Sequence, residues 1–199
     1  EKTKIDNINL NNVSFSFNKK INVLKNINFN LDENKIIGIC GKSGSGKTTF
    51  IDIISGLIEP TEGEILINGV KSEHSNEVLI SNSTYCSQKT ILIDDTLKNN
   101  ITLDTSDSNS REDVLYKAIK IAELDQFIKN LENGVNTIIG EKGIRVSGGE
   151  AQRINIARTI FTERKFIFFD ESLNNLDMIT SKKILNNLKN LKNKTIFFI

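Results

Sequence analysis

A glycine-rich turn between an apolar run and a helical pattern constrains this chain more than any other feature. The apolar run covers residues 36–40, and a short, nearly continuous run of this kind predicts a buried parallel strand. The turn reads Gly41-Lys42-Ser43-Gly44-Ser45-Gly46-Lys47-Thr48. Apolar residues then recur at helical spacing, at Phe50, Ile51, Ile53 and Ile54, and the pattern stops near Gly56. The sequence therefore predicts a strand, a glycine-rich loop and a helix in succession.

The turn fits the pattern G-x-x-x-x-G-K-[ST] of a phosphate-binding P-loop, in the context that this motif requires. Glycines let the backbone curl so that successive N–H groups point at a phosphate, and the helix N-terminus adds partial positive charge. We expect Lys47 to reach the β- and γ-phosphates and Thr48 to ligate Mg²⁺. The nucleotide-binding residues expected here are Gly41, Ser43, Gly44, Ser45, Gly46, Lys47, Thr48 and Thr49. The flanking strand and helix argue against a chance match of a glycine–serine loop.

Two acidic residues end a second apolar run, Phe166–Phe169. Open α/β sheets bind their ligands at the carboxyl ends of the strands, where Asp170 and Glu171 are expected to lie. Asp170 can hold Mg²⁺ and Glu171 can polarise an attacking water. Taken alone, an apolar run before an Asp-Glu pair more often marks only a strand that continues into a loop.

The remaining pattern alternates strands with helices, which predicts an α/β core with a parallel sheet. Further strands are expected at 8–17, 23–31, 64–67, 84–86 and 195–199. Further helices are expected at 96–101, from Ser110, at 126–131, from Gly149, and around 184–191. Ser110 and Asp113 approximate a capping box at the start of the second of these helices. We expect residues 1–199 to form a single domain. The helix-rich block at about 91–161 is typical of an inserted lobe.

Composition excludes several classes of protein. The chain has 26 basic and 25 acidic residues, a net charge of +1, which argues against a dedicated nucleic-acid binder. We expect no signal peptide, and no apolar run is long enough to span a bilayer. Cys40 and Cys86 lie in apolar runs, so we expect two buried free thiols in a reducing compartment. His74 lies in a polar stretch and is expected to be a solvated loop residue.

Val146-Ser147-Gly148-Gly149-Glu150 resembles the signature L-S-G-G-Q of the ATP-binding cassette (ABC) ATPases. The P-loop, the signature and the Asp-Glu pair occur in the same order as in this family. The resemblance covers essentially the whole chain. Gln88 matches the Q-loop glutamine, Leu173–Asp177 resembles the D-loop, and Phe17 occupies the position of the aromatic residue that stacks on adenine. The resemblance implies an α/β P-loop NTPase core with an antiparallel β subdomain and an inserted α-helical subdomain.

Two further stretches resemble the exporters of this family. Asp95–Ile101 is similar to their T-I-x-x-N-I, and Thr137–Gly143 is similar to their T-x-V-G-E-x-G, which contacts the membrane domains. The alternative is that Gly140 and Gly143 merely shape a loop. The resemblance implies the nucleotide-binding domain of an exporter, whose upstream transmembrane domain is absent from this chain. The family's switch histidine is expected just after Thr195–Ile199, where the sequence ends, so we expect a C-terminally truncated domain that binds ATP and hydrolyses it slowly.

The resemblance also implies the ligands and partners. The ligands are ATP and Mg²⁺. Two domains sandwich two ATP molecules head to tail, with the P-loop and the acidic pair from one copy and Ser147, Gly148 and Gly149 from the other. The implied catalytic residues are Glu171, Gln88 and Lys47, and the implied Mg²⁺ ligands are Thr48, Gln88 and Asp170. The implied partners are a second nucleotide-binding domain and transmembrane domains at the cytoplasmic face of the inner (plasma) membrane, without nucleic acid; the isolated domain is expected to be soluble.

Some residues depart from the family pattern, and some alternatives stay open. Glu150 replaces the usual glutamine, which should keep the helix start intact; Phe17 replaces the commoner tyrosine; and Asn174 and Asn175 alter the D-loop. A non-transport ABC ATPase and an ATP-gated dimerisation clamp with little turnover remain alternatives, whereas a small-molecule P-loop kinase would leave the signature unexplained. Residues 91–96 faintly resemble the segment after the Q-loop in exporters of lipid-linked oligosaccharides. Export of a peptide, a lipid or a drug stays open.

Overall fold

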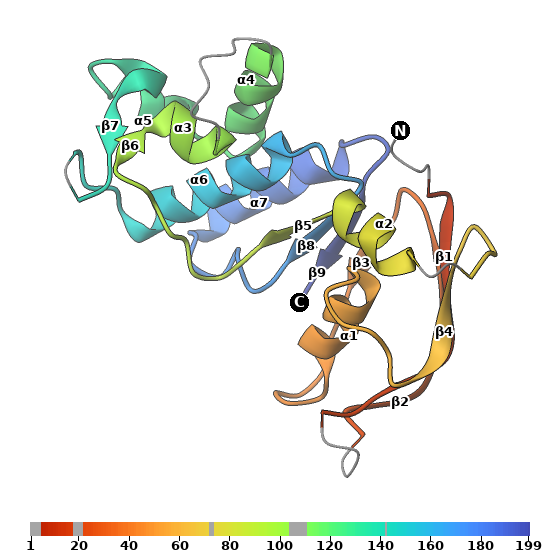
Figure 1. The fold of residues 1–199 in the computed structure, drawn as a ribbon. Coiled ribbons are helices and arrows are strands. Elements are labelled where there is room, and N and C mark those ends of the chain that lie inside the picture. Colours follow the sequence, from red (N-terminus) through yellow and green to blue (C-terminus); the bar gives the residue numbers. More distant parts are fainter. Residues whose placement is uncertain (1–4, 18–21, 72–73, 104–110, 142) are drawn as a thin grey trace. The chain divides into compact units, whose positions relative to one another are not determined.

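The chain divides into two compact units (Figure 1). The computed structural model describes residues 5–17, 22–71, 74–103, 111–141 and 143–199. The first unit comprises Glu1–Thr84, Arg164–Phe168 and Lys192–Ile199, and the second comprises Tyr85–Glu163 and Phe169–Leu191. Among the helices of the described ranges, none combines the length and the apolar character needed to cross a bilayer.

An antiparallel sheet forms one layer of the first unit. Its strands are β1 (Asn7–Phe15), β2 (Leu24–Asp32) and β4 (Glu62–Ile67), in the order β2-β1-β4. The register of β1 shifts between Leu10 and Val13, where Asn12 has a φ of +50°. This irregularity explains why the apolar alternation in the sequence becomes regular only from Val13 onward.

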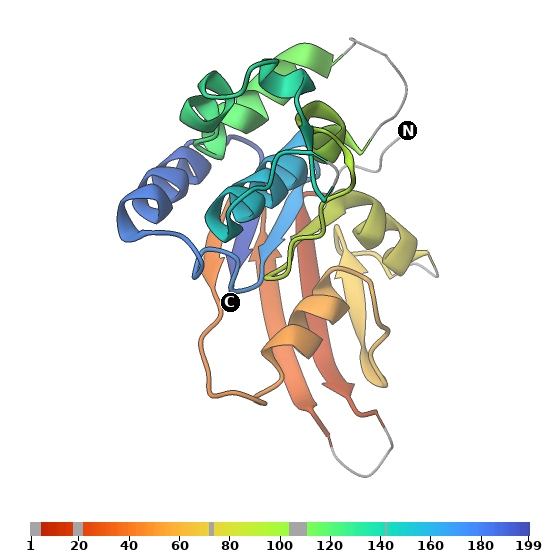
Figure 2. The same cartoon turned by 90° about the vertical axis from the view of Figure 1, so that its left-hand side faces the viewer.

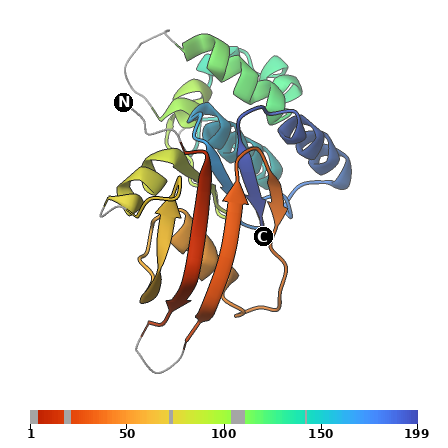
Figure 3. The same cartoon turned by 90° about the vertical axis from the view of Figure 1, so that its right-hand side faces the viewer.

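Helix α1 (Lys47–Ile54) covers one face of this sheet, in front of the strands in Figure 2 and behind them in Figure 3. Phe50 of α1 meets Phe29 of β2 edge to face, with ring centroids 5.4 Å apart. The helix ends as predicted, with Gly56 at a φ of +84°. Glycine is needed there because a Cβ would lie 2.6 Å from the carbonyl oxygen of Asn76.

The second sheet has the order β3-β9-β8-β5, with β3 (Ile36–Gly38), β9 (Thr195–Phe198), β8 (Phe166–Phe169) and β5 (Ser83–Cys86). β3 pairs in parallel with β9, as predicted. The expectation that the strand from residue 36 is buried was wrong, because β3 is the edge strand and Ile36 remains 47% exposed. Cys40, expected to be buried, is exposed because it lies beyond the end of β3; Cys86 is buried as expected.

Helix α2 (Ser75–Asn82) of the first unit was not predicted. Its sequence is mostly polar, Leu79 is its fully buried apolar residue and Ile80 is 48% exposed, so it lacks a clear apolar face. His74 lies at its N-cap, exposed, with Nδ1 3.6 Å from the carboxylate of Glu77. The side chain is solvated as expected, although it begins a helix rather than lying in a loop.

The second unit is mainly helical. It contains α3 (Leu97–Thr102), α4 (Glu112–Ile121), α5 (Asp125–Lys129), a 3₁₀ turn (Gly134–Asn136), α6 (Gly148–Phe161), α7 (Met178–Lys189), and a short ribbon of β6 (Asp95–Thr96) with β7 (Ile138–Ile139). Both α3 and α4 pack against α6, and α4 also contacts α7 (Figure 1). The predicted start of α4 was wrong in detail, because the helix begins at Glu112 with Arg111 as its N-cap; Ser110 lies outside the described residues.

Candidate nucleotide-binding site

The glycine-rich turn joins β3 to α1 in the first unit, as predicted. Gly44 and Gly46 have φ values of +76° and +88°, a left-handed conformation that other residues rarely adopt. A Cβ at Gly46 would also lie 3.0 Å from the carbonyl oxygen of Val23. The N–H of Ser45 donates to the carbonyl of Lys42 at 3.1 Å, which closes the curl. These glycines are therefore required by the shape of the loop.

The side chain of Lys47 folds back over this turn. Its ammonium donates to the carbonyl oxygens of Gly41 at 3.1 Å and Lys42 at 3.2 Å. Carbonyl oxygens accept from a cation in the same way as phosphate oxygens, so the ammonium already lies among acceptors. Thr48 is exposed, whereas the side chain of Thr49 is buried. The backbone N–H of Thr49 is one of the first-turn groups that lack a partner within the helix, so it is available to a phosphate.

Phe17 also belongs to the first unit and is 75% exposed. Its ring meets Phe15 edge to face, with centroids 4.9 Å apart and planes at 89°. This contact uses the edge of one ring and leaves aromatic surface of Phe17 in solvent. An exposed aromatic face is what stacking on a nucleotide base requires.

The second unit brings together the polar residues that follow β5 and β8. The N–H of Asp170 donates to the carbonyl of Cys86 at 3.1 Å, which joins the ends of the two strands. The Nε2 of Gln88 donates to Oε2 of Glu171 at 3.3 Å, and both side chains are exposed. Glu171 has a φ of +46°, a strained backbone conformation for a residue other than glycine. Gln88 and Glu171, which the resemblance places in one catalytic set, are thus direct neighbours.

The residues expected to bind Mg²⁺ suit that ion chemically. Thr48 offers a hydroxyl, Asp170 a carboxylate and Gln88 an amide oxygen, and Mg²⁺ prefers such hard oxygen ligands. Among the described residues, there is no group of three or more His, Cys, Asp or Glu side chains that could hold a metal. Mg²⁺ is usually bound through one or two carboxylates together with substrate phosphates.

The signature segment begins helix α6. Ser147 is the N-cap and its Oγ accepts from the N–H of Glu150 at 3.3 Å, while Oε2 of Glu150 accepts from the N–H and Oγ–H of Ser147, each at 2.7 Å. This reciprocal arrangement is a capping box. Glu150 thus keeps the helix start intact, as expected. No atom lies within 4 Å of a Cβ built on Gly148, so this position faces open space.

The D-loop stretch ends in the N-cap of α7. Oδ1 of Asp177 accepts from the N–H groups of Ile179 and Thr180, each at 3.0 Å. A hydrogen bond from the hydroxyl of Thr180, followed by these backbone bonds, lowers the pKa of Asp177. Asn174 and Asn175 are exposed. The altered D-loop therefore still contains an ionised helix cap.

The two exporter-like stretches lie side by side, which their separation in the sequence did not reveal. Asp95 pairs with Ile139 and Thr96 with Ile138 in the β6–β7 ribbon. Gly140 has a φ of +109°, so this glycine does shape the loop, as the alternative interpretation holds.

A groove of about 600 Å³ lies beside this ribbon in the second unit. It is lined by Leu92, Gly140, Glu141, Arg145 and Val146. Exposed isoleucines occur in the same stretches of chain: Ile91 (77%), Ile93 (42%), Ile138 (53%) and Ile144 (44%). Arg145 was not predicted from the sequence as a residue of this surface, although isoleucines in loop segments were an available signal.

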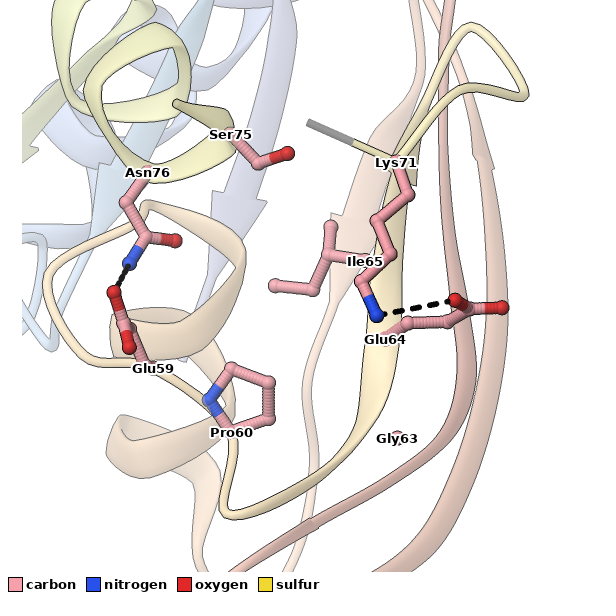
Figure 4. Close-up of a pocket in the computed structure, with 8 residues that line it drawn as sticks. All are labelled: Glu59, Pro60, Gly63, Glu64, Ile65, Lys71, Ser75 and Asn76. Atoms are coloured by element: carbon pink, nitrogen blue, oxygen red, sulfur yellow. Dashed lines mark hydrogen bonds and ion pairs between the residues drawn. The ribbon is translucent and has the colours of Figure 1, made fainter. Parts of the chain in front are cut away.

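A smaller cavity of about 220 Å³ lies in the first unit between α2, β4 and the turn that carries Glu59 (Figure 4). Nζ of Lys71 lies 3.6 Å from a carboxylate oxygen of Glu64, and Nδ2 of Asn76 donates to Glu59 at 3.0 Å. The charged groups that line this cavity thus interact with polar side chains of the cavity itself, and we assign it no ligand.

Comparison with known proteins agrees with this geometry. The family model described as ABC transporter matches residues 24–174. A putative export ATP-binding/permease protein of Rickettsia typhi is 35% identical over 92% of this chain and 32% of its own length. An ATP-dependent lipid A-core flippase of Francisella tularensis is 37% identical over 96% of this chain and 31% of its own length. The chain therefore spans about a third of these relatives.

A solved structure supports the same conclusion. A bacterial Atm1-family ABC exporter with ATP bound superposes with a TM-score of 0.84 at 30% identity, over 99% of this chain and 35% of the exporter chain. The predicted α/β P-loop NTPase fold is thereby confirmed. Because the family match covers most of the sequence and the P-loop has the required form, this chain belongs to the ABC transporter family and is an ABC-type, nucleotide-binding ATPase domain.

Proposed function

We propose that this chain binds MgATP and that its ATP hydrolysis powers export by a transporter whose membrane domains lie outside the sequence. The observation that carries the proposal is the position of Lys47, whose ammonium lies over the curled P-loop. Lys47 and the backbone N–H groups of residues 41–49 would bind the phosphates. Phe17 would stack on the adenine with its exposed ring.

Mg²⁺ would be held by Thr48, Asp170 and Gln88. When bound, it neutralises charge that develops on the phosphate oxygens. Glu171 would accept a proton from the attacking water. Gln88, whose amide donates a hydrogen bond to the carboxylate of Glu171, would orient this carboxylate. Exposure of both side chains leaves the carboxylate accessible to a water molecule.

A complete site would take its parts from two copies of the chain. The signature residues Ser147, Gly148 and Gly149 would close on the γ-phosphate bound by the P-loop of a second copy, since a helix N-terminus suits an anion. The open space at Gly148 supports this arrangement, because a bulky group can approach the start of α6 there.

The surface that would face the membrane domains includes the groove beside the β6–β7 ribbon. Exposed apolar side chains around Ile91 and Ile138 favour a protein partner over solvent. The exporter names of the relatives, including a lipid A-core flippase and a lactococcin transport/processing protein, support export as the coupled process but leave the substrate open. The chain would then act at the cytoplasmic face of the membrane.

Replacement of Lys47 tests nucleotide binding directly. Lys47→Ala should weaken MgATP binding by about 1.5–3 kcal/mol, the range for a hydrogen bond to a charged group. Titration with a fluorescent ATP analogue measures this change. Lys42→Ala is the matched control, because it removes the same charge from an exposed position of the same turn and should leave the Kd nearly unchanged. An unaltered Kd for Lys47→Ala would remove this residue from the site and refute the proposal.

A further inference from the structure

The start of α6 already holds an anion, and that anion is a side chain of the chain itself. Oε2 of Glu150 accepts two hydrogen bonds at 2.7 Å, one from the N–H of Ser147 and one from its hydroxyl. The short distances are typical of bonds to an ionised acceptor. The hydroxyl proton and the N–H of Ser147 are therefore committed to this carboxylate.

These are donors of the kind that an incoming phosphate would need. A hydroxyl has one proton to donate, so Ser147 cannot bond Glu150 and a phosphate oxygen with it at the same time. The carboxylate also places a negative charge at the helix N-terminus, where it offsets the positive end of the helix dipole. The start of α6 can therefore close on a phosphate in two ways, and each of them costs free energy.

In the first route Glu150 rotates away and two charge-assisted hydrogen bonds are lost. In the second it stays, and a carboxylate and a phosphate with like charges lie close together. A neutral glutamine at this position would lower both costs, since neutral hydrogen bonds are about half as strong as charge-assisted ones. It would still cap the helix, because its amide oxygen accepts from the same groups of Ser147.

We propose that Glu150 is a positioning residue that competes with the γ-phosphate of a partner copy for Ser147, and so raises the ATP concentration needed for closure of the two-copy site. This inference rests on the proposed function, in which Ser147 faces that phosphate. It assigns to Glu150 a second role beyond the helix cap. The competing contact is the pair of hydrogen bonds from Ser147 to Oε2.

The test measures ATP-driven association of the chain by analytical ultracentrifugation at increasing MgATP. All variants carry Glu171→Gln, so that loss of the proposed base keeps ATP intact during the run. Adding Glu150→Gln should lower the ATP concentration at half-association by about twofold to fivefold, the range expected when a charge at a helix terminus is removed. Glu112→Gln, in the first turn of α4, is the matched control and should change nothing.

Two further measurements separate this role from the helix cap. Glu150→Gln keeps a neutral cap and should lower the melting temperature less than Glu150→Ala, which loses the cap. The gain from Glu150→Gln should shrink in a Ser147→Ala background, because the hydroxyl for which the two anions compete is gone.

Failure of the role assigned to Glu150 and failure of the two-copy site would give different results. An association midpoint that Glu150→Gln leaves unchanged overturns the inference and leaves the two-copy site standing. Absence of ATP-driven association in every variant, at concentrations that saturate ATP binding, overturns both. A lower midpoint with Glu150→Gln that persists unchanged in Ser147→Ala shows that the charge acts elsewhere and also overturns the inference.

Discussion

Cys40 and Cys86 have the same side chain in opposite surroundings. Cys86 is fully buried at the end of β5, and this burial raises the pKa of its thiol to about 11. Cys40 is exposed at the entrance to the P-loop. Both cysteines lie in strand-like runs of the sequence, so the sequence could not separate them; the position of Cys40 beyond the end of β3 does.

We therefore expect a single fast thiol in the folded chain. At pH 8 only about 0.1% of Cys86 would be thiolate, the reactive form, whereas Cys40 is open to solvent. Titration with an aromatic disulfide reagent should give one rapid equivalent from the folded chain and a second only after unfolding. Cys40→Ser should remove the rapid phase, and Cys86→Ser should leave it. Two rapid equivalents from the folded chain would show that Cys86 is not protected.

At the scale of elements, the side chain of Asn100 links α3 to the loop before it by hydrogen bonds. Its side chain is fully buried, its Nδ2 donates to the carbonyl oxygens of Ile93, Asp95 and Thr96, and its Oδ1 accepts from the N–H of Ile93 at 2.9 Å. Nε of Arg158 in α6 donates to the backbone carbonyl of Asn100 at 2.9 Å. A single amide thus holds the segment that leads from the Q-loop into the β6–β7 ribbon.

Removal of this amide should destabilise the chain. Asn100→Ala leaves the backbone groups of Ile93 without these partners, and we expect the free energy of unfolding to fall by about 2–3 kcal/mol. Asn99→Ala is the control, because Asn99 is half-exposed and its one side-chain bond, to Asp95, can be replaced by water. Urea denaturation monitored by circular dichroism measures both. Equal losses for the two variants would contradict the role assigned to Asn100.

Some elements could be predicted from the sequence and others could not. The helices α1 and α6 and the strand β8 follow from apolar periodicity or continuous apolar runs, which local sequence displays directly. By contrast, α2 has a polar sequence with little apolar periodicity, and the β6–β7 ribbon joins Asp95 to Ile139, far along the chain. Pairing between such distant short strands has no local signal.

The same division holds for the candidate site. The P-loop is local, so its glycines and Lys47 could be predicted from spacing alone. The hydrogen bond between Gln88 and Glu171 joins the ends of two strands far apart in the sequence, and only the family resemblance placed these residues together. Which donors Glu150 occupies depends on side-chain geometry, which a sequence pattern does not contain.

At the scale of the whole molecule, the proposed two-copy site requires a surface at which two chains can meet. The net charge of +1 offers little electrostatic repulsion between copies. Met178 and Ile179, which follow the D-loop at the start of α7, are each 70% exposed, and exposed apolar side chains of this kind are typical of a surface that a partner covers. A head-to-tail pair would use the P-loop of each copy with the signature of the other.

Mixing two inactive variants tests this pairing. Lys47→Ala damages the P-loop, and Gly148→Asp places a carboxylate in open space at the start of α6, where no neighbouring atom obstructs it. Each variant alone should release little phosphate from ATP. In a mixed pair, the intact P-loop of one copy meets the intact signature of the other, so an equal mixture should recover up to about a quarter of the unmodified rate, if copies combine at random. Two differently tagged Lys47→Ala chains contain no intact P-loop and should recover nothing. If the mixture stays inactive while sedimentation shows that mixed pairs form, each site must lie within one copy, because shared sites would have been restored.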